Sequence, residues 1–220
     1  MHLSSIHSTI AIIIFSWSMG FLTYYILSDS TKAEKKASME EIAGQLIHFV
    51  IFLWIGKIIL NLNIFIIDPL AILAYPSNSY AFYFAILLSG FTIVIQYKRR
   101  KIDALPFSIA FTYIFLTASF VYEFMQVIWN KNIYSTGYLS LIALLIITFV
   151  VLRNFVHPHW LNLLILLGWS IGSLSLAMIK PILIVFGYSI APWFLVFILI
   201  ICCGLILSQK MKAGVVNGRN

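Results

Sequence analysis

Charged residues are scarce in this chain. They account for 10% of its 220 residues, whereas 62% are hydrophobic and the mean hydropathy is +1.01. A water-soluble domain of this length could not bury so much apolar surface in its core. The composition therefore excludes a soluble globular protein and predicts a chain whose apolar surface is covered by lipid.

Cysteine is nearly absent too, and the two that occur, Cys202 and Cys203, are adjacent. Adjacent side chains point about 100° apart on a helix, whereas metal sites and dithiol redox centres favour a spacer of two residues. We interpret both cysteines as small apolar residues of a helix. His157 and His159 have no acidic residue or cysteine nearby in the sequence to complete a metal site. The sequence therefore predicts no metal and no cofactor.

Motifs of nucleotide-binding proteins and hydrolases are missing as well. We find no phosphate-binding glycine loop, no metalloprotease helix motif and no hydrolase nucleophile elbow. Ser170 and Ser173 belong to the segment 168–173, whose small residues permit close contact between helices. No base for a serine nucleophile is evident on the same helix face. The sequence assigns no catalytic residue.

The sequence contains instead seven long apolar segments. Each is close to the roughly 20 residues that an α-helix needs to cross a hydrocarbon core about 30 Å thick. Continuous apolar runs of this length exclude the short alternating strands of a barrel. We therefore predict an all-α fold, a polytopic membrane protein in which residues 1–220 form a single domain with seven transmembrane helices. The segments lie at residues 6–28, 44–61, 77–97, 105–128, 137–152, 160–179 and 183–207.

Basic residues occur almost entirely in every second gap between these segments. Because basic residues mark the cytoplasmic face of a membrane, we expect the N-terminus outside and the C-terminus inside. The net charge of +7 is spread over short juxtamembrane segments, so contact with anionic lipid head groups accounts for it and no nucleic-acid partner is predicted. The predicted inner side has Lys32, Lys35, Lys36, Lys98, Arg99, Arg100, Lys101, Arg153, Lys210, Lys212 and Arg219, and the outer side has Lys131 and Lys180.

Two ionisable residues lie well inside apolar segments, where a charge costs about 2.5 to 3.5 kcal/mol at a helix centre. Lys57 is near the outer end of the second segment, and Glu123 is in the outer half of the fourth. The predicted topology puts them at similar depth, so we expect an ion pair that either fixes helix register or lines a polar cavity. Tyr83, Tyr122 and Gln126 are further polar groups at that depth. These five residues are the candidate lipid-binding or cavity residues.

Other local features lead to smaller predictions. Ser38 is a candidate N-cap of the second helix. Residues 64–74 are expected to form a short interfacial helix that begins near Asp68 and Pro69. Lys180 is expected to extend toward lipid head groups. An aromatic belt at the outer boundary is predicted from Trp129, Tyr134, Tyr138, Tyr188 and Trp193.

A pattern of motifs extends over the first four apolar segments. It consists of residues 20–28 running into the charged loop 32–41, Gly56–Lys57 inside the second segment, Asp68–Leu73 after it, and the basic turn Gln96–Lys101 leading to Leu105–Phe107. This layout resembles that of prolipoprotein diacylglyceryl transferase, a family of bacterial membrane enzymes. The resemblance implies seven spans with an outside N-terminus in a bacterial plasma membrane. It also implies a phospholipid partner, because the family transfers diacylglyceryl from phosphatidylglycerol to a lipoprotein cysteine.

The family's catalytic signatures are missing from this chain. Ser79–Tyr83 stands where the family has its glycine-rich stretch with a histidine, and no arginine occurs between Lys101 and Arg153, where the family has a Gly-Arg-x-Gly-Asn signature. Arginine binds an anionic head group through charge-assisted hydrogen bonds. The resemblance therefore implies a divergent relative that binds phospholipid, a lipoprotein or another membrane protein. The alternatives are an active transferase, an accessory or assembly subunit of another membrane complex, and a small-solute transporter.

Overall fold

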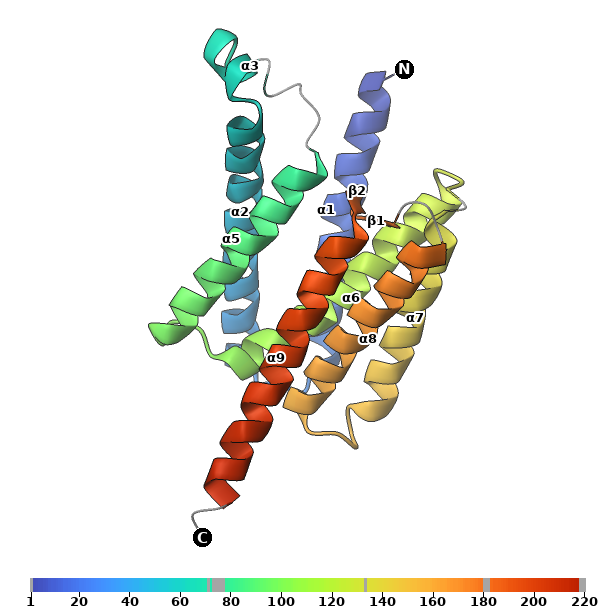
Figure 1. The fold of residues 1–220 in the computed structure, drawn as a ribbon. Coiled ribbons are helices and arrows are strands. Elements are labelled where there is room, and N and C mark those ends of the chain that lie inside the picture. Colours follow the sequence, from blue (N-terminus) through green and yellow to red (C-terminus); the bar gives the residue numbers. More distant parts are fainter. Residues whose placement is uncertain (1, 71, 73–77, 133, 180–182, 218–220) are drawn as a thin grey trace. The chain divides into compact units, whose positions relative to one another are not determined.

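The chain is mostly helical in the computed structural model (Figure 1). The structure describes the backbone of residues 2–70, 72, 78–132, 134–179 and 183–217, and the side chains of these ranges between residues 9 and 204. This helical content agrees with the predicted α-helical bundle. In chain order the elements are α1 (His2–Leu27), α2 (Lys32–Leu60), α3 (Leu62–Ile67), α5 (Ser79–Lys98), α6 (Ala104–Ile128), α7 (Ser135–Leu152), α8 (Pro158–Ile179), β1 (Leu183–Val185), β2 (Tyr188–Ile190) and α9 (Pro192–Asn217).

Apolar side chains cover the outside of these helices, whereas small polar side chains are buried between them. On α7, Leu144 and Ile147 are each 60% exposed, while Ser16, Ser119 and Ser170 are at most 1% exposed. A protein in water buries apolar side chains and exposes polar ones, whereas helices surrounded by lipid expose apolar side chains and bury polar ones. Among the described residues, six helices are long and apolar enough to cross a membrane, namely α1 (from Thr9), α2, α5, α6, α7 and α8.

The seventh predicted segment, residues 183–207, differs in the structure. Its first part forms a two-stranded antiparallel hairpin, and α9 begins only at Pro192. Within the described side chains, the apolar part of α9 is Pro192–Gly204, which is shorter than the other candidate spans. The prediction of one continuous helix from residue 183 is therefore wrong. The count of seven spans and the sidedness of the termini stay predictions.

The hairpin forms because of its turn. Phe186 and Gly187 join the two strands with φ values of 50° and 86°. A two-residue turn with both φ values positive has a twist that matches two antiparallel strands. The strands alternate in burial, with Leu183, Val185 and Ile190 inside. A local turn thus interrupts an apolar run that hydropathy alone assigns to a helix.

The chain divides into two compact units. Unit 1 consists of Met1–Thr23 and Thr112–Asn220, and unit 2 consists of Tyr24–Phe111. Unit 1 contains most of α1, the second part of α6, helices α7 to α9 and the hairpin, and unit 2 contains α2, α3 and α5. That residues 1–220 form one domain stays a prediction.

In unit 2, α2 begins earlier than expected. Its N-cap is Thr31, whose hydroxyl accepts a hydrogen bond from the Glu34 backbone N–H at 3.3 Å, while the Glu34 carboxylate accepts from the Thr31 N–H at 2.9 Å. This reciprocal capping box satisfies two backbone donors at the helix start. The prediction of Ser38 as the cap is therefore wrong, because Ser38 is buried inside the helix.

A short helix follows α2. It is α3, and Asp68 is its C-cap. The Asp68 carboxylate accepts a hydrogen bond from the Leu70 backbone N–H at 3.0 Å, which turns the chain after α3. Residues 71, 73 and 74 of the interfacial helix predicted at 64–74 lie outside the described residues, so a helix that begins near Asp68 and Pro69 stays a prediction. Lys180 and Arg219 lie outside the described residues too.

The helices α2 and α5 pack directly against each other in unit 2. They approach so closely at Gly56 that an added Cβ would lie 3.3 Å from the Ala81 Cα and 3.0 Å from Phe84 Cδ1. The Gln45 side-chain amide donates a hydrogen bond to Gln96 Oε1 at 2.6 Å. Small residues and interhelical hydrogen bonds are the usual contacts of helices in lipid, and together they fix the register of this pair.

In unit 1, α8 contacts both α7 and α9 and lies between them (Figure 1). Gly168 and Gly172 make room for α7, because a Cβ at Gly168 would lie 3.0 Å from Leu145 Cδ2 and one at Gly172 would overlap Leu141. The small residues of segment 168–173 thus permit the close helix contact expected from the sequence.

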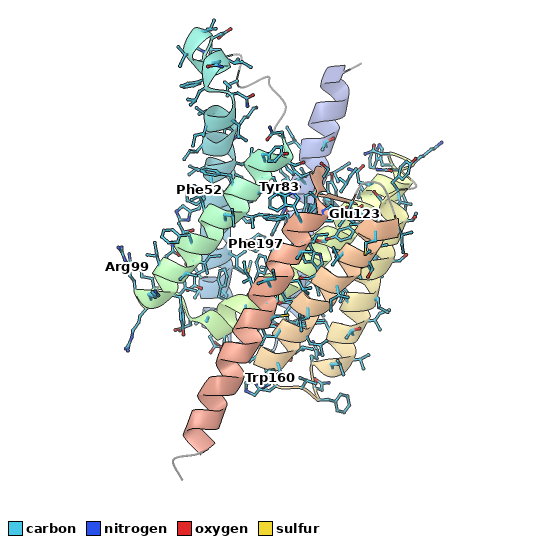
Figure 2. The ribbon with its side chains drawn as sticks, viewed as in Figure 1. Phe52, Tyr83, Arg99, Glu123, Trp160 and Phe197 are labelled. Carbon is cyan, nitrogen blue, oxygen red and sulfur yellow. The ribbon has the colours of Figure 1, made fainter. Side chains whose placement is uncertain are left out.

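Sidedness can be tested by labelling single cysteines in whole cells, in a background without Cys202 and Cys203. We expect a membrane-impermeant maleimide to label Lys131→Cys from outside, and to label Arg99→Cys and Lys210→Cys only after the membrane is permeabilised. Arg99 is exposed at the end of α5 (Figure 2), so its substitution leaves packing intact. Labelling of the Arg99 and Lys210 positions from opposite faces would contradict the predicted topology.

Candidate ligand site in unit 1

Glu123 is a carboxylic acid almost completely buried among apolar helices. It lies near the end of α6 and is 2% exposed (Figure 2). The Ser135 hydroxyl is hydrogen-bonded to its carboxyl group, whereas Oε1 has no hydrogen-bond partner among the described residues. An ionisable group at membrane depth costs several kcal/mol unless it is partnered. Its open oxygen therefore makes Glu123 the leading candidate for a functional residue.

Three further side chains of unit 1 form a series of contacts that begins at this carboxyl group. Ser135 is the first residue of α7, which brings its hydroxyl to the end of α6. Tyr138, one turn further, lies within electrostatic range of Glu123 and accepts a hydrogen bond from Trp169 Nε1 of α8 at 2.7 Å. The ring of Phe115 packs edge-on against Trp169 with centroids 5.9 Å apart. We call Glu123, Ser135, Tyr138 and Trp169 the Glu123 cluster, and these contacts hold it in a fixed geometry.

Tyr122 connects α6 to the hairpin. Its ring centroid is 5.2 Å from that of Phe186, and its hydroxyl lies 3.3 Å from where a Cβ would stand at Gly187. The Gln126 side chain is hydrogen-bonded to the Tyr122 hydroxyl. Phe186 also stacks on Trp17 of α1 at 5.6 Å. The turn of the hairpin is thus packed against aromatic residues of α1 and α6, next to the Glu123 cluster in the sequence of α6.

A small crevice lies beside the cluster. It has a volume of about 10 Å³, which is room for about one water molecule. Ser135 and Tyr138 belong both to its lining and to the Glu123 cluster, whereas Glu123 itself is not part of the lining. Its wall is polar along Asn132, Tyr134, Ser135 and Tyr138 and apolar along Leu176, Leu183 and Ile184.

The five residues predicted from the sequence fall into different units. Tyr122, Glu123 and Gln126 belong to unit 1, and the hydrogen bond between Tyr122 and Gln126 brings two of them together. Lys57 and Tyr83 belong to unit 2, where both are buried. The Lys57 ammonium group lies 5.9 Å from the Trp54 ring centroid. An ion pair between Lys57 and Glu123 would join the two units, and it stays a prediction.

Tyr138 is the functional candidate that the sequence analysis assigned wrongly. Trp129 is 71% exposed and Tyr134 is 70% exposed, as an aromatic belt requires. Tyr138, by contrast, is 2% exposed and hydrogen-bonded to Trp169. No signal in the sequence separated Tyr138 from the belt residues, because a tyrosine near the end of a span also fits an interfacial belt.

In the described part of the chain, the cysteines and the possible metal ligands form no second candidate site. Cys202 and Cys203 are free thiols, and the Cys202 sulfur lies 3.9 Å from the Ser170 hydroxyl. No group of three or more histidine, cysteine or acidic side chains is close enough to hold a metal ion among the described residues. The Glu123 cluster is therefore the site with the strongest chemical signal.

The six apolar helices, their apolar outer surfaces and their buried serines define the class: this is a multi-pass α-helical membrane protein. Comparison of the chain with models of known protein families, with curated proteins and with solved structures found no match in any of the three.

Proposed function

We propose that this protein binds a membrane phospholipid, or the lipid-modified end of a partner protein, through the Glu123 cluster. The single observation that carries the proposal is the open Oε1 of a carboxyl group that is 2% exposed. A buried carboxyl oxygen without a hydrogen-bond partner costs free energy at membrane depth. A ligand that donates a hydrogen bond to this oxygen would remove that cost.

The lining of the nearby crevice combines polar and apolar residues. One wall offers the polar groups of Asn132 and Ser135, and the other offers Leu183 and Ile184 of the hairpin. Just along α8 from the crevice, Met178 and Ile179 are at least 80% exposed. A ligand with a polar head and an apolar chain matches both surfaces, because the head can reach the cluster while the chain covers exposed apolar residues.

The proposal includes kinship with prolipoprotein diacylglyceryl transferase, as a divergent relative. The resemblance in the first four apolar segments supports this kinship, and the missing arginine signature favours binding over diacylglyceryl transfer. Lys57 and Tyr83 are part of the proposed binding surface only by that resemblance and by their predicted depth. The contacts within unit 1 support the Glu123 cluster without them.

The test is the amount of phospholipid that stays with the protein. We expect Glu123→Gln to reduce co-purified phospholipid per protein about tenfold after identical detergent washes, because a charge-assisted hydrogen bond becomes a neutral one. Quantitative lipid mass spectrometry measures this ratio. Glu40→Gln is the matched control, since Glu40 is an exposed carboxylate 3.8 Å from Lys36. Equal phospholipid in the wild type, Glu123→Gln and Glu40→Gln would refute the proposed site.

A further inference from the structure

The chemistry of the Glu123 cluster selects the kind of head group. A carboxylate only accepts hydrogen bonds, whereas the hydroxyls of Ser135 and Tyr138 can donate or accept. The aromatic rings of Tyr138 and Trp169 present faces that attract cations. None of the four cluster residues is basic. A group that donates several hydrogen bonds and has a positive charge therefore fits this cluster, and a phosphate placed directly on it would be repelled by Glu123.

A cation lies where the turn from α6 to α7 begins. Lys131 is exposed and adopts a left-handed conformation with φ 50°. The next residue, Asn132, lines the crevice and donates its backbone N–H to the Gln126 carbonyl at 3.1 Å, which fixes the turn after α6. The acidic group of the site is thus buried within α6, and the basic group lies beyond the end of α6.

From this arrangement we propose that the ligand is a phospholipid with a primary ammonium head group. The ammonium group binds Glu123 Oε1, the phosphate faces Lys131, and the acyl chains cover Met178 and Ile179. This inference rests on the proposed function and adds the head group to it. Because the crevice has room for about one water molecule, binding of the head group requires its lining side chains to shift.

A cation with N–H donors distinguishes an ammonium head group from the head groups of other common phospholipids. Phosphatidylglycerol has no cation to place on Glu123. Phosphatidylcholine has a cation but no N–H donor, so the open Oε1 would stay without a hydrogen bond. An ammonium group supplies both the charge and the donors, and an interaction of that kind with a carboxylate is among the stronger hydrogen bonds in proteins.

Native mass spectrometry of the purified protein, titrated with phosphatidylethanolamine, phosphatidylcholine or phosphatidylglycerol of identical acyl chains, tests the inference. We expect the wild type to bind phosphatidylethanolamine at least about tenfold more tightly than either other lipid. Glu123→Gln is expected to remove that preference. Lys131→Ala, an exposed substitution that leaves the fold intact, is expected to weaken phosphatidylethanolamine binding severalfold. Arg99→Ala is the matched control, because Arg99 is an exposed cation of unit 2.

The outcomes separate this inference from the proposed function. Equal binding of phosphatidylglycerol and phosphatidylethanolamine by the wild type, with both lost in Glu123→Gln, would overturn the ammonium head group and keep the lipid site. Equal binding of every lipid by the wild type and Glu123→Gln would overturn both. Competition by water-soluble glycerophosphoethanolamine as strong as that by the lipid would show a site for a free amine, and would overturn the assignment to a lipid.

Discussion

Gly20→Val is expected to lower the melting temperature of the detergent-solubilised protein by roughly 5 to 10 °C. A Cβ at Gly20 would lie 2.6 Å from the carbonyl oxygen of Ile114 and 3.2 Å from Ile114 Cγ2. The first of these atoms belongs to the backbone of α6 and cannot rotate away, so α1 and α6 have to separate. Overpacking of this kind costs about 1 to 3 kcal/mol or more, which is roughly 2 to 4 °C per kcal/mol for a chain of this size.

A matched control exists for this substitution. Gly90 of α5 has no atom within 4 Å of its Cβ position, so Gly90→Val makes the same chemical change in a helix without the clash. We expect Gly90→Val to melt close to the wild type, and Gly20→Ala to fall between the wild type and Gly20→Val. Size-exclusion chromatography after a series of heating steps measures all four proteins. A Gly20→Val protein as stable as Gly90→Val would show that α1 and α6 do not pack through this glycine.

The helices of the second half of the chain could be predicted closely from the sequence. The segment expected at 105–128 is α6, that at 137–152 is α7 and that at 160–179 is α8, each within a few residues. Such agreement follows from the physics of the bilayer, because an apolar run of the right length has to satisfy its own backbone by forming a helix. Boundaries set by hydropathy therefore need no knowledge of tertiary contacts.

The errors occur where local chemistry is stronger than hydropathy. Residues 183–190 are as apolar as a span, yet the left-handed Phe186 and Gly187 make them a hairpin. A cap at Thr31 extends α2 through a charged stretch that hydropathy excludes from the span. Both signals are short: a glycine after one residue in an alternating run, and a threonine followed three positions later by a glutamate. Each could have been recognised, but neither outweighs a long apolar run in a hydropathy count.

The candidate site was predicted only in part, for a geometric reason. Glu123 could be identified from sequence because a lone acid in an apolar run is rare and costly. Its neighbours Ser135 and Tyr138 could not, because their contact depends on how α7 is rotated against α6. A tyrosine near the end of a span fits an interfacial belt equally well. Only the hydrogen bond from Trp169 shows that Tyr138 is buried in the protein and does not belong to the interfacial belt.

Gly187→Val is expected to lower the melting temperature by roughly 4 to 8 °C and to reduce the phospholipid that co-purifies with the protein. Gly187 has a φ of 86°, a left-handed conformation that costs an ordinary residue about 1 to 2 kcal/mol and a β-branched residue more. Its added Cβ would also press on the Tyr122 hydroxyl at 3.3 Å. The hairpin then shifts against α6, and Leu183 and Ile184 no longer line the crevice in the same way.

Asparagine at the same position separates backbone strain from contact with Tyr122. Both variants carry a Cβ, but asparagine adopts left-handed conformations far more readily than valine. We expect Gly187→Asn to melt within a few degrees of the wild type, while Gly204→Val, which has nothing within 4 Å of its Cβ position, is unchanged. If Gly187→Asn loses as much stability as Gly187→Val, the crowding of Tyr122 is the dominant effect. If Gly187→Val retains both stability and phospholipid, the hairpin does not form the wall of the ligand site.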